Sequence, residues 1–132
     1  MSIAFNGSCE IYYESFGVWG SPQYADEDRW RRLAERAFDR CFHPAGTAHQ
    51  YRAVGSSPPR GERLRSVTTP TLVIHGDKDT LIDISGGRRT AELIPGARFE
   101  IIEGLGHDYP PQLWERWVEL VSSFVASVSL PT

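Results

Sequence analysis

Two short loops in the second half of the chain carry side chains that could move a proton. The first reads His-Gly-Asp-Lys-Asp over residues 75–79, and the second reads Gly-Leu-Gly-His-Asp over residues 104–108. A carboxylate beside an imidazole fixes the tautomer of the ring and stabilises its protonated form, which is the principle of an acid–histidine relay. Asp79 and His107 could form such a relay if the fold brings the two loops together.

The elements around these loops predict that they meet. Residues 71–74 are a continuous apolar run, as in a strand buried on both faces of a parallel sheet, and residues 97–102 read as a second strand. A helix is expected between them over roughly 86–94. This order implies a right-handed crossover between parallel strands, so both loops leave the same edge of the sheet. The long helix expected after the second loop has an apolar stripe of Leu113, Trp117, Leu120, Val121, Phe124 and Val128.

The residue types alone leave the acid open, because three aspartates lie in this region. Asp77 could cap a turn, Asp83 could cap the following helix, and Asp79 could do either. His107 could equally be a solvated loop residue.

The first half of the chain is expected to hold a hairpin and then helices. Asn6-Gly7 separates two alternating apolar segments and predicts a two-residue hairpin turn. A helix is expected over 26–41 and a shorter one over 45–54, followed by a loop over 55–61. We therefore expect one domain, 1–132, made of a hairpin (1–17), a helical segment (18–69) and a βαβα module carrying the acid and the histidine (70–128).

Composition narrows the class of protein. The chain has 132 residues and a net charge of −3, so no basic field invites nucleic acid. Its two cysteines are too few for a disulfide framework, and no apolar run reaches the ~18 residues of a membrane span. The first residues lack the basic and apolar regions of a signal peptide. These features predict a cytoplasmic protein with no nucleic-acid or membrane partner.

The second half of the chain resembles the C-terminal end of the α/β-hydrolase fold, close to its small esterase and lipase-like members. The segment 70–79 looks like the strand and turn that present the family's triad acid, which matches Asp79. Gly104-Leu105-Gly106-His107 looks like the loop that presents the triad histidine, which matches His107. The resemblance implies that Asp79 and His107 are the catalytic residues. It extends to the opening hairpin of the family, which residues 6–17 resemble.

The family's nucleophile elbow, Gly-x-Ser-x-Gly between a strand and a helix, has no match in the sequence. Residues 55–59 read Gly-Ser-Ser-Pro-Pro, and the prolines forbid the helix that should follow. Cys9 and Cys41 are expected to be small buried residues rather than reactive thiolates. The nucleophile is therefore unidentified, either a serine not placed by a motif or a water. The resemblance implies a reduced hydrolase-like α/β fold, with a small, mostly parallel sheet flanked by helices and its central strands missing.

The leading interpretation is a minimal carboxylic-ester hydrolase that acts on a small-molecule ester and needs no cofactor and no metal. One alternative is a catalytically inactive remnant that serves as an oligomeric or binding protein. Another is one half of a complementing pair, in which a partner chain supplies the central strands and the elbow serine. Without those strands, residues 71–74 would have an unpaired edge, and such edges attract other chains. A homodimer or higher oligomer is expected, with domain swapping as one route to it.

Overall fold

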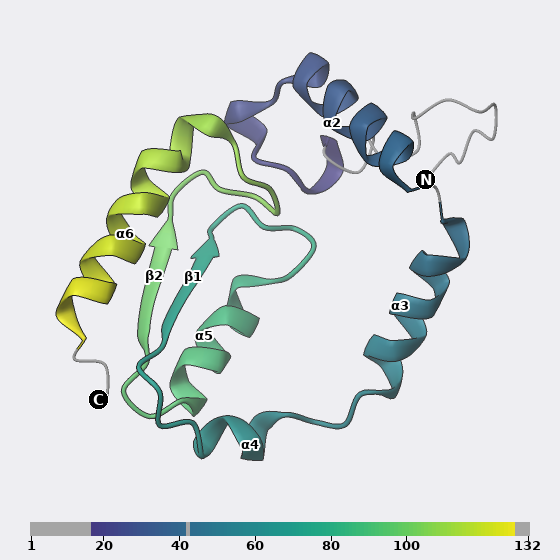
Figure 1. Ribbon diagram of the computed structural model, residues 1–132. Coiled ribbons are helices and arrows are strands. Elements are labelled where there is room, and N and C mark those ends of the chain that lie inside the picture. Colours follow the sequence, from purple (N-terminus) through teal and green to yellow (C-terminus); the bar gives the residue numbers. More distant parts are fainter. Residues whose placement is uncertain (1–16, 42, 129–132) are drawn as a thin grey trace.

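The computed structural model of the chain describes residues 17–41 and 43–128 (Figure 1). The hairpin expected over 1–17 lies outside the described residues except for Gly17, and so does Cys9. The described elements are, in order, η1 (Pro22–Tyr24), α2 (Glu27–Arg40), α3 (Pro44–Ser56), α4 (Gly61–Arg65), β1 (Leu72–Gly76), α5 (Ile84–Leu93), β2 (Arg98–Ile102), η2 (Pro111–Leu113) and α6 (Trp114–Ser127).

The sheet of the described residues has two parallel strands. Strand β1 pairs with β2 so that Leu72 lies opposite Arg98 and Gly76 lies opposite Ile102. Helix α5 makes the connection between them (Figure 1). The small parallel sheet and the strand–helix–strand order predicted from the sequence are confirmed. As expected from that order, the loops after both strands leave the same edge.

The two faces of the sheet are covered by different helices. On one face, a side chain added at Gly87 of α5 would meet His75 of β1, and the guanidinium of Arg88 stands 5.5 Å from the ring centre of Phe99. On the other face, Ile102 packs with Leu120 of α6. The alternation of side chains along each strand thus separates an α5 face from an α6 face.

The core lies between the sheet and α6. Ile102, Leu105 and Leu120 are each no more than 3% exposed and form its centre. Ile74, Leu113 and Trp117 pack around them. The stripe predicted for the last helix therefore faces the core at Leu113, Trp117 and Leu120, whereas Val121 is 46% exposed.

The helices before the sheet differ from the expectations at their ends. Helix α2 begins at the Asp26 cap, whose carboxylate accepts a hydrogen bond of 2.8 Å from the Arg29 amide. It ends at Arg40 because Cys41 adopts extended backbone, and Cys41 is exposed, so its expected burial is wrong. Helix α3 continues to Ser56, into the expected loop. The short helices η1, α4 and η2 were not predicted.

Helix α3 and the outer face of α6 are poorly covered. Every residue from 48 to 60 is exposed, including Tyr51 at 84% and Val54 at 65%. Figure 1 shows α3 standing apart from the sheet. On α6, Val118 and Val125 are 67% and 56% exposed. Within the described ranges, no helix is long and apolar enough to cross a membrane.

Two consecutive prolines join the second loop to the last helix. Pro110 is fully buried and has extended backbone, and Pro111 begins η2. The carbonyl of Tyr109, just before them, accepts hydrogen bonds from the indole of Trp114 and from the guanidinium of Arg29. Because each proline ring fixes its own φ angle, this connection is stiff.

Candidate active site

Asp79 lies in the loop that follows β1, and its carboxylate closes a tight turn. Its Oδ1 atom accepts hydrogen bonds from the amides of Leu81 (3.0 Å) and Ile82 (2.8 Å). An aspartate that bonds the amides two and three residues ahead in this way orders its own loop. The side chain is 8% exposed, so its orientation is fixed and largely protected from water.

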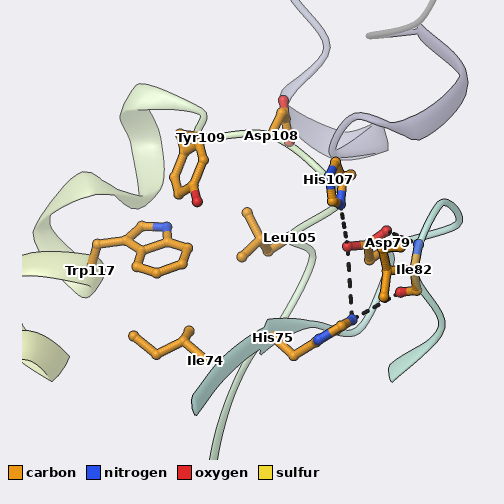
Figure 2. Close-up of a pocket in the computed structure, with 10 residues that line it drawn as sticks. Ile74, His75, Asp79, Ile82, Leu105, His107, Asp108, Tyr109 and Trp117 are labelled. Atoms are coloured by element: carbon orange, nitrogen blue, oxygen red, sulfur yellow. Dashed lines mark hydrogen bonds and ion pairs between the residues drawn. The ribbon is translucent and has the colours of Figure 1, made fainter. Parts of the chain in front are cut away.

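His107 lies in the loop that follows β2 and meets Asp79. Its Nδ1 atom is 2.7 Å from Asp79 Oδ2, so the ring donates a hydrogen bond to the carboxylate (Figure 2). The imidazole is 46% exposed, which leaves the Nε2 side of the ring able to reach solvent or a ligand. Gly104 has a φ of +76°, so the loop turns where a side chain would be strained. The structure therefore brings together the two residues that the sequence singled out.

The environment of Asp79 favours its charged form. Burial raises the pKa of this carboxyl, but the amide hydrogen bond from Ile82 and the hydrogen bond and charge of His107 outweigh that effect. Its pKa consequently lies below the usual value of an aspartate. A carboxylate that stays ionised can hold the neutral imidazole in one tautomer and stabilise the imidazolium.

His75, the last side chain of β1, is a further member of the site that the sequence did not assign a role. Its Nε2 atom lies 2.9 Å from the carbonyl oxygen of Ile82, to which it donates, and 3.8 Å from Asp79 Oδ2 (Figure 2). The ring is 11% exposed. Ile82 thus receives a hydrogen bond from His75 and gives one to Asp79, which braces the acid loop against the strand.

The two competing aspartates have structural roles. Asp77 accepts a hydrogen bond of 2.6 Å from the Gly104 amide and so ties the acid loop to the histidine loop. Asp83 caps α5 by accepting from the Ser85 amide at 2.8 Å. Hydrogen bonds from Ser85 lower the pKa of Asp83. Asp79 is the aspartate of the three that bonds His107.

A cavity of about 250 Å³ opens beside the pair (Figure 2). Its apolar wall includes Ile74, Leu105 and Trp117, and the ring of Tyr109 lies 5.1 Å from that of Trp117. Asp79 and His107 belong to the polar side of the cavity. Apolar side chains therefore line one part of the cavity, and the carboxylate and the imidazole line another.

The described serines have their hydroxyl groups engaged away from His107. The hydroxyls of Ser56 and Ser57, the two serines of the Gly-Ser-Ser-Pro-Pro segment, both donate to the carbonyl of Ala53 in α3. Ser21 donates to Asp108. Across residues 17–41 and 43–128, no serine hydroxyl is hydrogen-bonded to His107, and no group of three His, Cys, Asp or Glu side chains could hold a metal ion. The described site thus contains an acid and a base without a hydroxyl nucleophile bonded to the base.

Comparison with known proteins gives this arrangement a family. A family model described as the alpha/beta hydrolase fold matches residues 10–110. The chain belongs to the alpha/beta hydrolase fold family. The resemblance to this family that the Asp79 and His107 loops indicated is therefore confirmed for the family and its fold.

Relatives match only part of their own length. A non-heme chloroperoxidase of Kitasatospora aureofaciens is 43% identical over 47 residues, which are 35% of this chain and 17% of that protein. A monoacylglycerol lipase of Mycolicibacterium smegmatis is 36% identical over 67 residues, 49% of this chain and 23% of that protein. A solved serine hydrolase involved in carbazole degradation has a TM-score of 0.70 at 19% identity, covering 96% of this chain and 50% of its own. The chain spans about half of that solved hydrolase.

Proposed function

We propose that the chain is a carboxylic-ester hydrolase in which His107 acts as the general base and Asp79 orients it. The observation that carries the proposal is the 2.7 Å contact between His107 Nδ1 and Asp79 Oδ2 at the rim of a partly apolar cavity. The names of two matched relatives, a monoacylglycerol lipase and a serine hydrolase, support hydrolysis as the type of reaction. An ester with an apolar acyl group suits the wall formed by Ile74, Leu105 and Trp117.

Water is the nucleophile in the reaction that the described residues can perform. His107 Nε2 takes a proton from a water molecule as its oxygen attacks the ester carbonyl carbon. The proton held on Nε2 then passes to the departing alkoxide oxygen as the carbon–oxygen bond breaks, which releases an acid and an alcohol. Asp79 stabilises the imidazolium between these steps. General-base catalysis of this kind accelerates a reaction by about 10²–10⁴-fold, so we expect slow turnover of activated esters.

Hydrolysis of a short-chain nitrophenyl ester tests this proposal. His107→Ala removes the base, and Asp79→Asn removes the charge that orients it, so both should abolish release of nitrophenol above the rate of water alone. Asp83→Asn is the matched control because Asp83 caps α5 without contacting His107, and it should retain the activity. Equal rates for the wild type and the His107 variant would refute the proposal.

The exposed apolar face of α6 favours a second candidate function, assembly with another copy of the chain. Val118, Val121 and Val125 lie on this face, over a groove of about 560 Å³. Strand β1 also has a partner on one side only in the described sheet. Sedimentation over a range of concentrations should reveal a dimer, and Val121→Glu should shift it toward monomer. A monomer at every concentration would exclude this role.

A partner chain that supplies a serine is the other way to complete the site, because no described serine hydroxyl is hydrogen-bonded to His107. A fluorophosphonate probe separates this case from the first proposal, because the probe labels only an activated serine. Labelling of this chain alone would place the nucleophile in its own 132 residues and would exclude the need for a partner. Ester hydrolysis without labelling would support water as the nucleophile.

A further inference from the structure

We propose that Asp108 and Ser21 are positioning residues that hold the His107 loop in its working geometry. The inference concerns the same site as the proposed esterase activity and rests on it for its kinetic part. Its structural part, the control of the orientation of His107, can be tested without any turnover.

The first observation is a buried hydrogen-bonded pair between segments 87 residues apart in sequence. Asp108 Oδ1 accepts from the amide of Ser21 at 2.9 Å and from its hydroxyl at 2.5 Å. Ser21 is fully buried, and Asp108 is 7% exposed. Burial keeps water from competing for these hydrogen bonds.

The second observation is that this pair fixes the backbone on both sides of the catalytic imidazole. The Gly106 amide donates to Ser21 Oγ at 2.8 Å, and the His107 amide donates to the carbonyl of Trp19 at 2.6 Å. Ser21 Oγ therefore accepts from Gly106 while it donates to Asp108. Three consecutive residues, from Gly106 to Asp108, are bonded to the segment Trp19–Ser21.

The same segment also reaches the acid loop. The hydroxyl of Thr80, next to Asp79, donates to the carbonyl of Val18 at 3.0 Å. Residues 18–21 are thus bonded to the loop that carries the acid and to the loop that carries the base. A segment bonded to both loops fixes their separation, and that separation sets the contact between His107 and Asp79.

The packing at Gly106 is too close for a side chain. A Cβ atom there would lie 2.4 Å from the carbonyl carbon of Gly20 and 2.7 Å from the amide nitrogen of Ser21. Both neighbours are backbone atoms, which cannot give way without moving the segment. Glycine at position 106 therefore allows the backbone of Gly20 and Ser21 to lie this close to the histidine loop.

Two substitutions separate the contributions of Asp108 and Ser21 to this contact. Oδ2 of Asp108 has no hydrogen-bond partner among the described residues. Asp108→Asn can place its amide nitrogen there and keep Oδ1 as an acceptor, so it retains the shape and replaces one carboxyl oxygen with an N–H donor. Ser21→Ala keeps the hydrogen bond from the backbone N–H of residue 21 to Asp108. It removes the hydroxyl that links Gly106 to Asp108.

The experiment measures the Nδ1 proton of His107 by NMR in the full chain, together with the kinetics of nitrophenyl ester hydrolysis. In the wild type, the hydrogen bond to Asp79 should give a low-field, slowly exchanging Nδ1 proton. Ser21→Ala should broaden or remove this signal and lower kcat by up to about a hundredfold with little change in KM, because the misplaced ring no longer meets the reacting group. Asp108→Asn should have a smaller effect in the same direction.

Ser57→Ala is the control, since its hydroxyl is exposed and donates to the carbonyl of Ala53 in α3, and it should leave the signal and kcat unchanged. Circular dichroism confirms that each variant is folded, and Asp108→Asn carries the test if Ser21→Ala does not fold. An unchanged Nδ1 signal in a folded Ser21→Ala or Asp108→Asn variant would overturn the inference. If the wild type shows the signal but hydrolyses no ester, the proposed function fails while the positioning role is still decided by NMR.

Discussion

The segment from β1 to α6 and the helix α3 differ in how they use their apolar residues. In the first, Ile102, Leu105 and Leu120 are almost completely buried, and hydrogen bonds join the two loops after the strands. In α3, Tyr51 and Val54 are largely exposed. The first region is held by its own contacts, whereas α3 has little packing of its own among the described residues.

This difference indicates which region of the chain stabilises the candidate site. The acid and the base both come from loops of the packed region, and the segment 18–21 is hydrogen-bonded to the same loops. None of the described side chains of α3 lines the cavity. We therefore expect substitutions in the packed region to change stability and site geometry together, and substitutions in α3 to leave the site geometry unchanged.

The largest expected contrast is between two apolar truncations. Leu120→Ala should lower the free energy of unfolding by about 2–5 kcal/mol, because it leaves a cavity in the core. Val54→Ala should change it by less than about 0.5 kcal/mol, because Val54 is 65% exposed. Urea denaturation of both variants measures the contrast. Similar losses would mean that α3 is covered in solution and that the two regions form one packed unit.

Two glycine substitutions test the same contrast between the packed region and α3, with smaller expected changes in stability. A Cβ at Gly76 would lie 2.1 Å from the backbone oxygen of Leu105, so Gly76→Ala should destabilise the packed region by about 1–3 kcal/mol. Nothing lies within 4 Å of a Cβ at Gly55 in α3, so Gly55→Ala should increase helicity, with a gain of up to about 1 kcal/mol in helix stability. Thermal unfolding and circular dichroism report the two effects. A loss of stability in the Gly55 variant would contradict the open surroundings of α3.

The smallest expected effect is a dependence on pH confined to the packed region. Because folding lowers the pKa of Asp79, the folded state binds fewer protons than the unfolded state in the acid range. The resulting stabilisation is complete above the unfolded pKa and is lost as the pH falls through the ordinary carboxyl range toward the folded pKa. The urea midpoints of the wild type and Asp79→Asn should therefore differ at about pH 6 and lie closer together at about pH 3. A constant difference at both values would show that Asp79 contributes no proton linkage.

Much of the packed region could be predicted because its signals are local. The apolar run at 71–74, the helical spacing of α6 and the two loops together indicate parallel strands, and parallel strands bring Asp79 and His107 to one edge. The order of the elements was enough to bring the two loops together, and the resemblance to the α/β-hydrolase fold pointed to Asp79 among the three aspartates. Their catalytic roles stay predictions, as do the division into three segments and the dimer.

The supporting contacts could not be predicted because they join distant segments. Ser21 and Asp108 are 87 residues apart, and neither has a spacing that would indicate a partner. The role of His75 depends on the orientation of one side chain toward the carbonyl of Ile82. The exposure of Cys41 follows from where α2 ends, and helix ends are weakly marked in sequence.

The stiff pair Pro110–Pro111 connects α6 directly to the histidine loop. With both φ angles fixed, this connection has fewer torsions that could absorb a shift of α6. Trp117, which lines both the cavity and the outer groove of α6, moves with it. If a shift of α6 alters the histidine loop, linkage makes the effect reciprocal: a compound in the cavity and a partner on α6 would change each other's affinity by the same factor.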